Sequence, residues 1–319
     1  MLDANPRKLL LFSGSSNRPL SEKIATSLSI KLGNCDLRRF SDGEIFVEVK
    51  ENVRGANVYI VQSTCAPVND NLMEILIIAD ALKRASVGSI TAVIPYYGYS
   101  RQDRKVAPRT PITAKLAADL YTAVGIDRVV SLDLHSGQIQ GFFDIPFDNL
   151  FARPVLLNYI ESHLKPKGDV VIVSPDAGGM ERARAYAKKI DCPVAMIDKR
   201  RSGPNIAKAM NLVGDVKGAI ALVVDDMIDT AGTLTEAADA LINHGAKEVY
   251  ACACHAVLSG PAVQRIRTSA IQKVIITDTI PLRGEALECD KFVVLSVAEL
   301  LGEAIRRIHY HDSVSQLFD

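Results

Sequence analysis

Short segments of β-branched and other apolar residues alternate with stretches of helical spacing along the whole chain, and this alternation limits the possible folds more than any other feature. The segments that we predict to be buried strands are Leu9–Phe12, Val58–Gln62, Ile90–Ile94, Arg128–Leu132, Val170–Val173, Ala219–Val224, Glu248–Cys252 and Lys273–Ile276. Between them, apolar residues recur so that they fall on one face of a helix. Two such sets are Leu72, Ile75, Leu76, Ala79 and Leu82, and Leu234, Ala237, Ala238, Leu241 and Ile242. This alternation predicts an α/β fold in which a mostly parallel sheet is covered by helices on both faces.

The two halves of the chain repeat one local pattern. Ala79–Leu82 and Ala238–Leu241 share the sequence Ala-Asp-Ala-Leu and lie about half the chain length apart. Each copy is followed by a turn and a strand, Ile90–Ile94 in the first half and Glu248–Cys252 in the second. Such a short match is weak alone, but the match, its context and its spacing together predict a duplicated α/β domain.

The duplication predicts a domain boundary near Asn149–Pro154, after a Gly-Phe-Phe-Asp-Ile-Pro segment that is typical of a loop. A chain of 319 residues is long enough for two domains with substantial cores. We therefore expect one domain over residues 1–150 and a second over residues 151–319. The tail of the second is expected to pack back on the first domain or on a neighbouring subunit.

Composition excludes several classes of function. Lys and Arg total 37, as do Asp and Glu, so there is no net basic charge to attract nucleic acid. No apolar run reaches the ~20 residues that span a bilayer, and the polar start does not resemble a signal peptide. The 6 cysteines lack metal-binding spacing, and Cys252 and Cys254 are best explained as buried side chains of a strand. These features predict a cytoplasmic enzyme that binds neither nucleic acid nor a membrane.

The clearest local signal is the segment Val223–Thr233, with the sequence Val-Val-Asp-Asp-Met-Ile-Asp-Thr-Ala-Gly-Thr. A buried strand ends in two adjacent carboxylates, Asp225 and Asp226, and a short loop then leads into an amphipathic helix. Ligands bind at the carboxyl ends of parallel strands, and a helix N-terminus with small residues and hydroxyls suits a phosphate monoester. The acids lie behind the loop, where they can accept hydrogen bonds from ribose hydroxyls. The predicted phosphate-loop residues are Asp229, Thr230, Ala231, Gly232 and Thr233.

The alternative explanation of this segment is an ordinary helix cap with solvated acids. Two acids at a strand end together with this loop favour the binding site. A second cluster, Lys199-Arg200-Arg201, follows the predicted buried strand Val194–Ile197. Three consecutive basic residues often form only a solvated patch. Because these residues follow a strand at the same end of the sheet as the acids, we predict that they serve the same site.

The segment Val223–Thr233 resembles the phosphoribosyl-diphosphate loop of type I phosphoribosyltransferases. The first half keeps the strand Val58–Gln62 and the helix after it, but the loop between them, Thr64–Asp70, is longer and lacks the acid pair. We therefore expect only the second half to bind a sugar phosphate.

Six further motifs, in the same order, resemble those of ribose-phosphate pyrophosphokinases, also called phosphoribosyl diphosphate synthetases. They are Phe40–Glu44, Pro95–Arg104, Asp133–His135, Gln138–Phe143, Ser174–Gly179 and Ile197–Arg201. The likeness extends from near Phe12 to Phe318. Ala177 and Ala231 vary positions in two loops; Ala231 replaces a glycine often found there and would be strained if its φ were positive.

This resemblance implies two duplicated phosphoribosyltransferase-like domains and a transfer of the diphosphate of Mg·ATP to O1 of ribose 5-phosphate. The implied products are AMP and 5-phosphoribosyl 1-diphosphate, a precursor for nucleotide, histidine and tryptophan biosynthesis. The resemblance places the catalytic lysine at Lys199 and its partner at Arg201, which also contacts the sugar phosphate. It further implies that Mg²⁺ is the cofactor, held against the ATP phosphates by His135 and Asp176, directly or through water.

The resemblance also supplies an ATP site. An aromatic ring can stack on adenine, carboxylates can accept from its amino group, and an arginine can reach a phosphate. The implied residues are Phe40, Asp42, Gly43, Glu44, Arg101 and Gln102. Some of them are expected to come from a neighbouring subunit.

The tail, residues 311–318, is short and polar but ends in two apolar residues. A frayed terminus is the usual structure of a last turn. The resemblance implies instead a regulatory anion site between subunits of a homohexamer, where inorganic phosphate activates and ADP inhibits. Ser313 and Ser315 match the hydroxyl pair of that site, whereas Gly137 stands where relatives can carry a serine.

Two alternatives to this function stay open. A phosphoribosyltransferase would share the Asp225–Thr233 loop but would not need Phe40–Glu44 or Arg101–Arg104. A non-catalytic regulatory homologue would be expected to lose part of the lysine loop or of the acid pair, yet Lys199 and Asp225 are both present.

Overall fold

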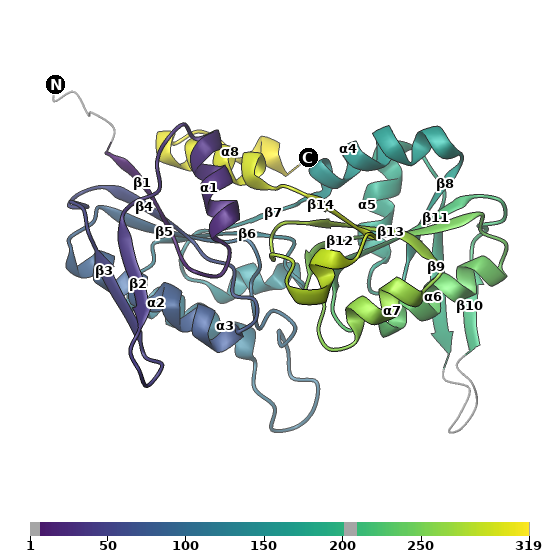
Figure 1. Cartoon of the computed structure of the whole chain (residues 1–319), viewed down its shortest axis with the longest axis horizontal. Coiled ribbons are helices and arrows are strands. Elements are labelled where there is room, and N and C mark those ends of the chain that lie inside the picture. The colour runs from purple at the N-terminus through teal and green to yellow at the C-terminus, as the bar shows by residue number, and fades with distance from the viewer. Residues whose placement is uncertain (1–6, 201–208, 319) are drawn as a thin grey trace. The chain divides into compact units, whose positions relative to one another are not determined.

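The computed structural model describes residues 7–200 and 209–318 and divides the chain into two units (Figure 1). The first unit comprises Met1–Phe151, Thr279–Pro281 and Ser296–Asp319, and the second comprises Ala152–Asp278 and Leu282–Leu295. Within the described ranges, none of the helices has the length and apolar character needed to cross a membrane.

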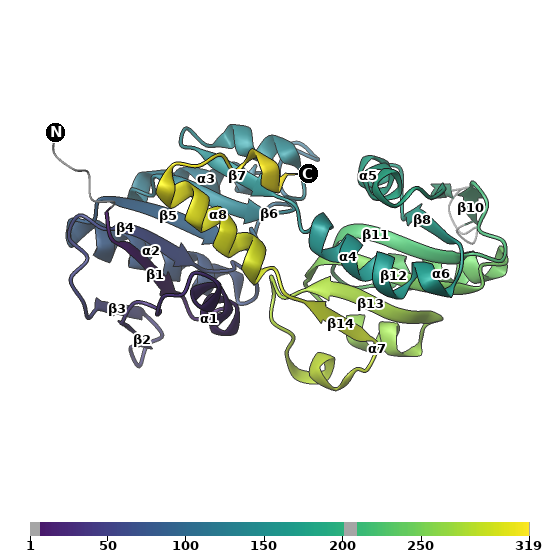
Figure 2. The ribbon, with the colours of Figure 1, turned by 90° about the horizontal axis from the view of Figure 1, so that it is seen from above.

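The first unit is built on a five-stranded parallel sheet with the order β1-β4-β5-β6-β7. Its strands are β1 (Leu9–Ser13), β4 (Asn57–Val61), β5 (Ser89–Ile94), β6 (Arg128–Leu132) and β7 (Phe147–Leu150). The helices α2 (Val68–Arg84) and α3 (Thr113–Val124) cover one face, and α1 (Arg18–Ser27) and α8 (Ala298–Tyr310) lie on the other (Figure 2). Because both faces are covered, the strands are apolar along nearly their whole length rather than alternating.

A separate antiparallel hairpin extends from the first unit between α1 and β4. It consists of β2 (Cys35–Arg39) and β3 (Ile45–Val49), with Arg39 opposite Ile45 next to the turn. The ion pair between Arg39 and Asp70 of α2, at 3.1 Å, ties its end to the body of the unit.

The second unit contains a seven-stranded sheet with the order β10-β9-β8-β11-β12-β13-β14, in which only the pair β9–β10 is antiparallel. Its strands are β8 (Val170–Ser174), β9 (Val194–Arg200), β10 (Ala209–Val213), β11 (Ile220–Ile228), β12 (Glu248–Ala256), β13 (Ile271–Thr277) and β14 (Phe292–Leu295). The helices of this unit are α4 (Arg153–His163), α5 (Met180–Ile190), α6 (Gly232–Asn243) and α7 (Ala262–Thr268).

The two sheets repeat one topology. The order β1-β4-β5-β6-β7 corresponds strand for strand to β8-β11-β12-β13-β14, and in each unit a two-strand excursion follows the first strand of the series. The helix carrying Ala79–Leu82 joins β4 to β5, and the helix carrying Ala238–Leu241 joins β11 to β12. In both copies the first Ala and the Leu are fully buried. The predicted fold class, α/β with two duplicated halves that each hold a mostly parallel sheet flanked by helices, is confirmed.

The second half does not form a unit by itself over the predicted range 151–319, because residues 296–319 belong to the first unit. The reason is the apolar face of α8, on which Leu301 and Ile305 are fully buried. Helix α8 packs closely on α1, and a Cβ at Gly302 would lie only 2.1 Å from the Ser27 hydroxyl oxygen. In the second unit, α4 occupies the corresponding place beside α5. Each unit therefore receives its last layer from a helix that follows the other unit's sheet.

Candidate active site

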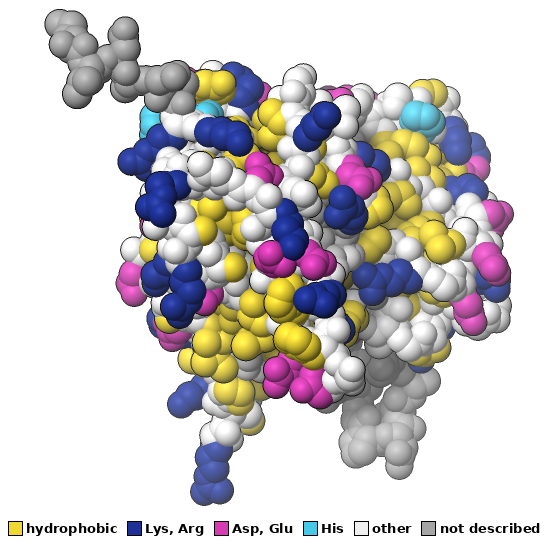
Figure 3. All heavy atoms as spheres, turned by 60° about the vertical axis from the view of Figure 1, so that its left-hand side comes forward, with side chains coloured by type: hydrophobic (Ala, Val, Ile, Leu, Met, Phe, Trp, Pro, Cys, Tyr) yellow, Lys and Arg dark blue, Asp and Glu magenta, His cyan; other side chains and the backbone are white. Residues whose placement is uncertain are grey.

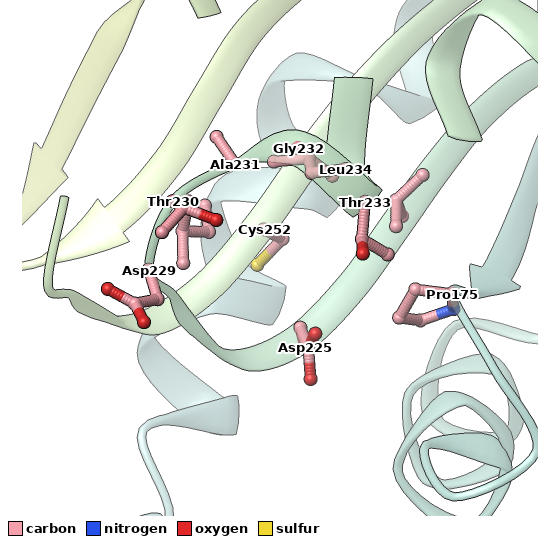
Figure 4. A pocket seen from close by; sticks show the side chains of 12 residues that line it. Pro175, Asp225, Asp229, Thr230, Ala231, Gly232, Thr233, Leu234 and Cys252 are labelled. Carbon is pink, nitrogen blue, oxygen red and sulfur yellow. The ribbon is translucent and has the colours of Figure 1, made fainter. Parts of the chain in front are cut away.

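A pocket of about 150 Å³ lies at the carboxyl end of β11 in the second unit (Figure 4). Its lining includes Pro175, Asp225, Cys252 and the loop from Asp229 to Thr233. The loop arches from β11 to the start of α6, with the Cys252 side chain beneath it. The structure thus brings Asp225 and the phosphate loop, which the sequence predicted to form one site, together at one pocket.

The acid pair lies within β11 and not after it, because the strand continues through Ile228. The carboxylates are held from α5: one guanidinium nitrogen of Arg182 lies 3.2 Å from Asp225 Oδ1 and 3.5 Å from Asp226 Oδ1. Asp226 is buried, at 5% exposure, whereas Asp225 is half-buried and borders the pocket. The backbone N–H of Asp226 also donates to Asp225 Oδ1 over 2.9 Å.

The electrostatics of this pair are unusual for surface acids. Burial and the neighbouring Asp226 raise the pKa of Asp225 to about 7, while Arg182 opposes the shift. The cause is the cost of a second negative charge next to the first in a partly desolvated place. Asp225 therefore takes up a proton near neutral pH.

The phosphate loop has the form that an anion requires. Ala231 adopts a left-handed conformation, with φ 58° and ψ 4°, and α6 begins directly after it without a side-chain cap. The first N–H groups of α6 therefore point toward the loop with no capping side chain, as in anion-binding helix termini. The guanidinium of Arg265 in α7 donates to the Thr230 carbonyl over 2.9 Å, and the Ser259 N–H donates to the Asp229 carbonyl over 3.1 Å.

The first two residues of the predicted catalytic cluster lie within β9 and not after it, because the strand continues through Arg200. Lys199 lies near the end of β9, opposite Met210 of β10, and Arg201 lies outside the described residues. Since β8 separates β9 from β11 and runs parallel to both, the carboxyl ends of all three strands meet at one edge of the sheet. This order places Lys199 at the same edge as Asp225.

The two residues predicted to hold a metal ion, Asp176 and His135, belong to different units. Asp176 follows β8, where its Oδ1 accepts the Gly179 N–H at 3.0 Å at the start of α5 and its carbonyl accepts the Ser174 hydroxyl at 2.6 Å. His135 follows β6 in the first unit, and both side chains are exposed. Over residues 7–200 and 209–318, no group of three or more His, Cys, Asp or Glu forms a metal cage by itself. An exposed carboxylate fits a Mg²⁺ that keeps water and substrate phosphates as its other ligands.

The predicted ATP-site residues lie on two segments of the first unit. Phe40, Asp42, Gly43 and Glu44 form the exposed turn of the β2–β3 hairpin, which the Phe40 N–H closes by donating to the Glu44 carbonyl over 2.8 Å. The Phe40 ring is 52% exposed and lies edge-on to Phe46 with 5.7 Å between ring centroids, so it is available for stacking. The second segment carries Arg101 and Gln102, both exposed, in the loop between β5 and α3.

In the first unit, polar groups at the start of the corresponding loop form hydrogen bonds with other parts of the protein. The Thr64 N–H donates to the Tyr96 carbonyl over 2.9 Å, and the Gly98 N–H donates to the Thr64 hydroxyl over 2.6 Å. The Ser63 hydroxyl donates to the Thr279 carbonyl over 2.5 Å. These contacts occupy the Thr64 N–H and the Ser63 and Thr64 hydroxyls, and the expectation that only the second half binds a phosphate stays a prediction.

The tail is packed on its own unit and is not frayed. Arg307 of α8 donates to the Ser313 carbonyl over 2.8 Å and to Gln316 Oε1 over 3.0 Å. The Ser315 N–H donates to the Ser313 hydroxyl oxygen over 3.2 Å. The Phe318 ring contacts Phe151 edge-on. The Ser313 hydroxyl of the predicted anion site is therefore in contact with the backbone of Ser315.

Comparison with known proteins decides the family. A sequence profile of the N-terminal domain of ribose phosphate pyrophosphokinase matches residues 9–125, and a profile of the phosphoribosyl synthetase-associated domain matches residues 201–319. The ribose-phosphate pyrophosphokinase of Caldanaerobacter subterraneus subsp. tengcongensis is 58% identical over 97% of this chain and 98% of its own length. The chain belongs to the ribose-phosphate pyrophosphokinase family.

Other relatives agree with this assignment. The ribose-phosphate pyrophosphokinase of Nitrosomonas europaea is 53% identical over 97% of this chain and 98% of its own length. The crystal structure of phosphoribosylpyrophosphate synthetase from Mycobacterium smegmatis superimposes with a TM-score of 0.91 at 42% identity, covering 96% of this chain and 100% of that one. The chain is therefore an enzyme of the ribose-phosphate pyrophosphokinase type.

Two arginines that contact lining residues of the pocket were not predicted from the sequence. Arg182 and Arg265 lie on α5 and α7, far along the chain from the segments that they contact. Arg182 follows the Ser174–Gly179 motif by three residues, and this closeness is the only sequence signal that singles it out.

Proposed function

We propose that this pyrophosphokinase transfers the terminal diphosphate of Mg·ATP to O1 of ribose 5-phosphate, releasing AMP and 5-phosphoribosyl 1-diphosphate. The observation that carries the proposal is the single pocket in which the half-buried acid Asp225 borders the uncapped N-terminus of α6. An acceptor pair for two hydroxyls beside a donor cluster for a phosphate suits a ribose 5-phosphate.

In this proposal each segment has one task. Asp225 and Asp226 accept hydrogen bonds from the ribose hydroxyls, and the loop from Asp229 to Thr233 binds the 5-phosphate. The sugar O1 attacks the β-phosphorus of ATP and the bond from that phosphorus to the AMP oxygen breaks. Because the chemistry demands positioning and charge neutralisation, Lys199 and Arg201 serve to stabilise the charge of the transferring group.

The contacts to the adenine nucleotide are assigned to residues of the first unit. The exposed Phe40 ring stacks on adenine, Asp42, Gly43 and Glu44 contact the base, and Arg101 and Gln102 contact the nucleotide. His135 and Asp176 would hold Mg²⁺, whose charge neutralises the ATP phosphates.

We also propose a homohexamer in the cytoplasm, activated by inorganic phosphate and inhibited by ADP through Ser313 and Ser315. The support is the packed tail, in which the Ser313 hydroxyl oxygen and the Ser315 N–H lie within 3.2 Å of each other. Both substrates are phosphorylated metabolites, which fits a cytoplasmic enzyme.

Phosphorus NMR of the protein with Mg·ATP and ribose 5-phosphate tests the reaction. We expect AMP and 5-phosphoribosyl 1-diphosphate to form in equal amounts. Formation of ADP would mean transfer of the γ-phosphoryl group and would overturn the proposal. Turnover that requires an added nucleobase and 5-phosphoribosyl 1-diphosphate, with no reaction of ATP, would indicate a phosphoribosyltransferase instead.

A further inference from the structure

One guanidinium contacts both carboxylates of the sugar site. Arg182 Nη1 lies 3.2 Å from Asp225 Oδ1 and 3.5 Å from Asp226 Oδ1, and the Arg182 side chain is 24% exposed. Two adjacent carboxylates repel each other, so without a cation between them they would turn apart or share a proton. An arginine stays charged at every pH at which a protein is folded, and its planar guanidinium can donate to two acceptors at once.

The position of this arginine is fixed by the fold. Helix α5 starts at Met180, directly after the loop in which Asp176 Oδ1 accepts the Gly179 N–H over 3.0 Å. Arg182 lies in the first turn of that helix, so its reach toward β11 depends on the same loop. The buried face of α5, which includes Ala183 and Tyr186, anchors the helix against the sheet.

The burial of the two acids makes this contact important. Asp226 is only 5% exposed, and a buried carboxylate without a charged partner is strongly unfavourable. Asp225 borders the pocket and must present its oxygens to the ligand. Arg182 thus satisfies the buried acid and orients the exposed one at the same time.

We propose that Arg182 is a positioning residue of the sugar site, which holds Asp225 and Asp226 as a fixed acceptor pair for two ribose hydroxyls and so sets the affinity for ribose 5-phosphate. This proposal rests on the proposed function only in assigning the acid pair to the sugar. Arg182 itself touches neither substrate; it acts through the two carboxylates.

The test compares Arg182→Gln and Arg182→Lys with Arg184→Gln, a change at an exposed position of the same helix. We expect Arg182→Gln to raise the KM and the directly measured Kd for ribose 5-phosphate roughly 10- to 100-fold, as the loss of an oriented charged acceptor predicts. The KM for ATP should change less than about twofold, and kcat much less than KM. Arg182→Lys keeps the positive charge but lacks the planar guanidinium, so its KM and Kd for ribose 5-phosphate should be intermediate. Arg184→Gln should have the same KM and Kd as the unchanged chain.

A pH profile separates positioning from mere structural support. Removing the guanidinium raises the pKa of the acid pair, so the acidic limb of kcat/KM for ribose 5-phosphate should move to higher pH in Arg182→Gln and stay in place in Arg184→Gln. A folded Arg182→Gln protein with unchanged ribose 5-phosphate affinity and an unchanged limb would overturn the proposal.

A second variant covers the case in which Arg182→Gln does not fold because the buried Asp226 loses its contact with the Arg182 guanidinium. Arg182→Met combined with Asp226→Asn removes the buried charge together with its partner. It should fold and still bind ribose 5-phosphate roughly tenfold or more weakly; affinity equal to that of Asp226→Asn alone would refute the role of Arg182. Calorimetric binding of ribose 5-phosphate is informative even if the unchanged chain yields no AMP, so failure of this inference and failure of the proposed reaction give different results.

Discussion

Ala231 adopts a backbone conformation that few residues other than glycine occupy. At φ 58° an L-residue is strained by about 1–2 kcal/mol, yet its methyl group is buried in the core beside α6. Replacing this alanine by glycine would relieve the strain but would lose about 0.8 kcal/mol of apolar burial from the methyl group. The lost burial offsets most of the relieved strain. This balance explains how an alanine can occupy this left-handed position.

The prediction at this position is a contrast between two substitutions. Ala231→Gly should change the free energy of unfolding by less than about 0.5 kcal/mol and leave the KM for ribose 5-phosphate within about twofold. Ala231→Val should destabilise the chain by roughly 2 kcal/mol or more and weaken ribose 5-phosphate, because a β-branched side chain is unfavourable in the left-handed region. Urea unfolding and steady-state kinetics measure both effects. An Ala231→Val protein as stable and active as the unchanged chain would show that the loop has another conformation.

Asp225 gives the site a pH dependence in the physiological range. Its pKa is raised to about 7 by burial and by Asp226, so as pH falls below about 7 it takes up a proton and loses acceptor capacity. We expect kcat/KM for ribose 5-phosphate to fall with decreasing pH, approaching tenfold per pH unit well below that value, while the KM for ATP stays nearly constant. In Asp225→Asn the overall value should be lower and this limb absent. A limb that persists in Asp225→Asn would have to be assigned to another group.

At the scale of secondary structure, a polar network in the first unit connects three elements. Glu74 of α2, which is 4% exposed, accepts hydrogen bonds from the Ser15 N–H at 2.6 Å, the Ser15 hydroxyl at 2.8 Å and the Gln62 amide at 2.7 Å. Gln62 Oε1 in turn accepts the Ser16 hydroxyl at 2.6 Å. The loop after β1, the end of β4 and α2 are thereby held together, on the edge of the sheet that corresponds to the sugar site in the second unit.

We predict that Glu74→Ala lowers the free energy of unfolding by about 3 kcal/mol, because it leaves several buried donors without their charged acceptor. The matched control is Asp80→Ala on the same helix, which removes only an exposed ion pair with Arg84. That change should cost less than about 0.5 kcal/mol. Equal effects of the two substitutions in equilibrium unfolding would contradict the importance of the network.

How far the sequence predicts these elements depends on burial. The central strands of both sheets were predicted because they are apolar on both faces, and β6 has the predicted bounds, Arg128–Leu132. The hairpin β2–β3 was not predicted, since its strands are only partly buried and carry charged residues. Strands β7, β10 and β14 were also missed, because they are short and all three lie at sheet edges.

The residues of the candidate site were also predicted only in part from the sequence. The acid pair and the phosphate loop are consecutive in sequence, so one strand, one turn and one helix start suffice to predict their arrangement. Arg182 and Arg265 reach them only through the packing of α5 and α7 on the sheet. No local pattern specifies which of the arginines on a helix will face a distant strand end, and the structure is needed to single them out.

At the scale of the whole molecule, the surface carries exposed apolar side chains that suit contacts between subunits. Large apolar side chains are exposed on α2 and α3, with Met73 at 52%, Leu116 at 56% and Leu120 at 39% exposure. Figure 3 shows apolar side chains grouped between charged ones on one face of the molecule. Clusters of exposed apolar side chains of this kind are typical of contact surfaces between proteins. They agree with the proposed homohexamer, which analytical ultracentrifugation can test.

The last prediction concerns control through the tail. Arg307 holds the tail by its contacts with the Ser313 carbonyl and Gln316, and it is itself oriented by Glu303 at 2.6 Å. The Ser313 and Ser315 hydroxyls and the nearby N–H groups are donors that suit an oxyanion. Deleting residues 312–319 should abolish activation by inorganic phosphate and reduce ADP inhibition to simple competition with ATP. The chemistry should be spared, because the residues proposed for it lie elsewhere. Initial rates at varied phosphate and ADP measure both effects. Purely competitive ADP inhibition in the intact protein, unchanged by the deletion, would show that the tail forms no regulatory site.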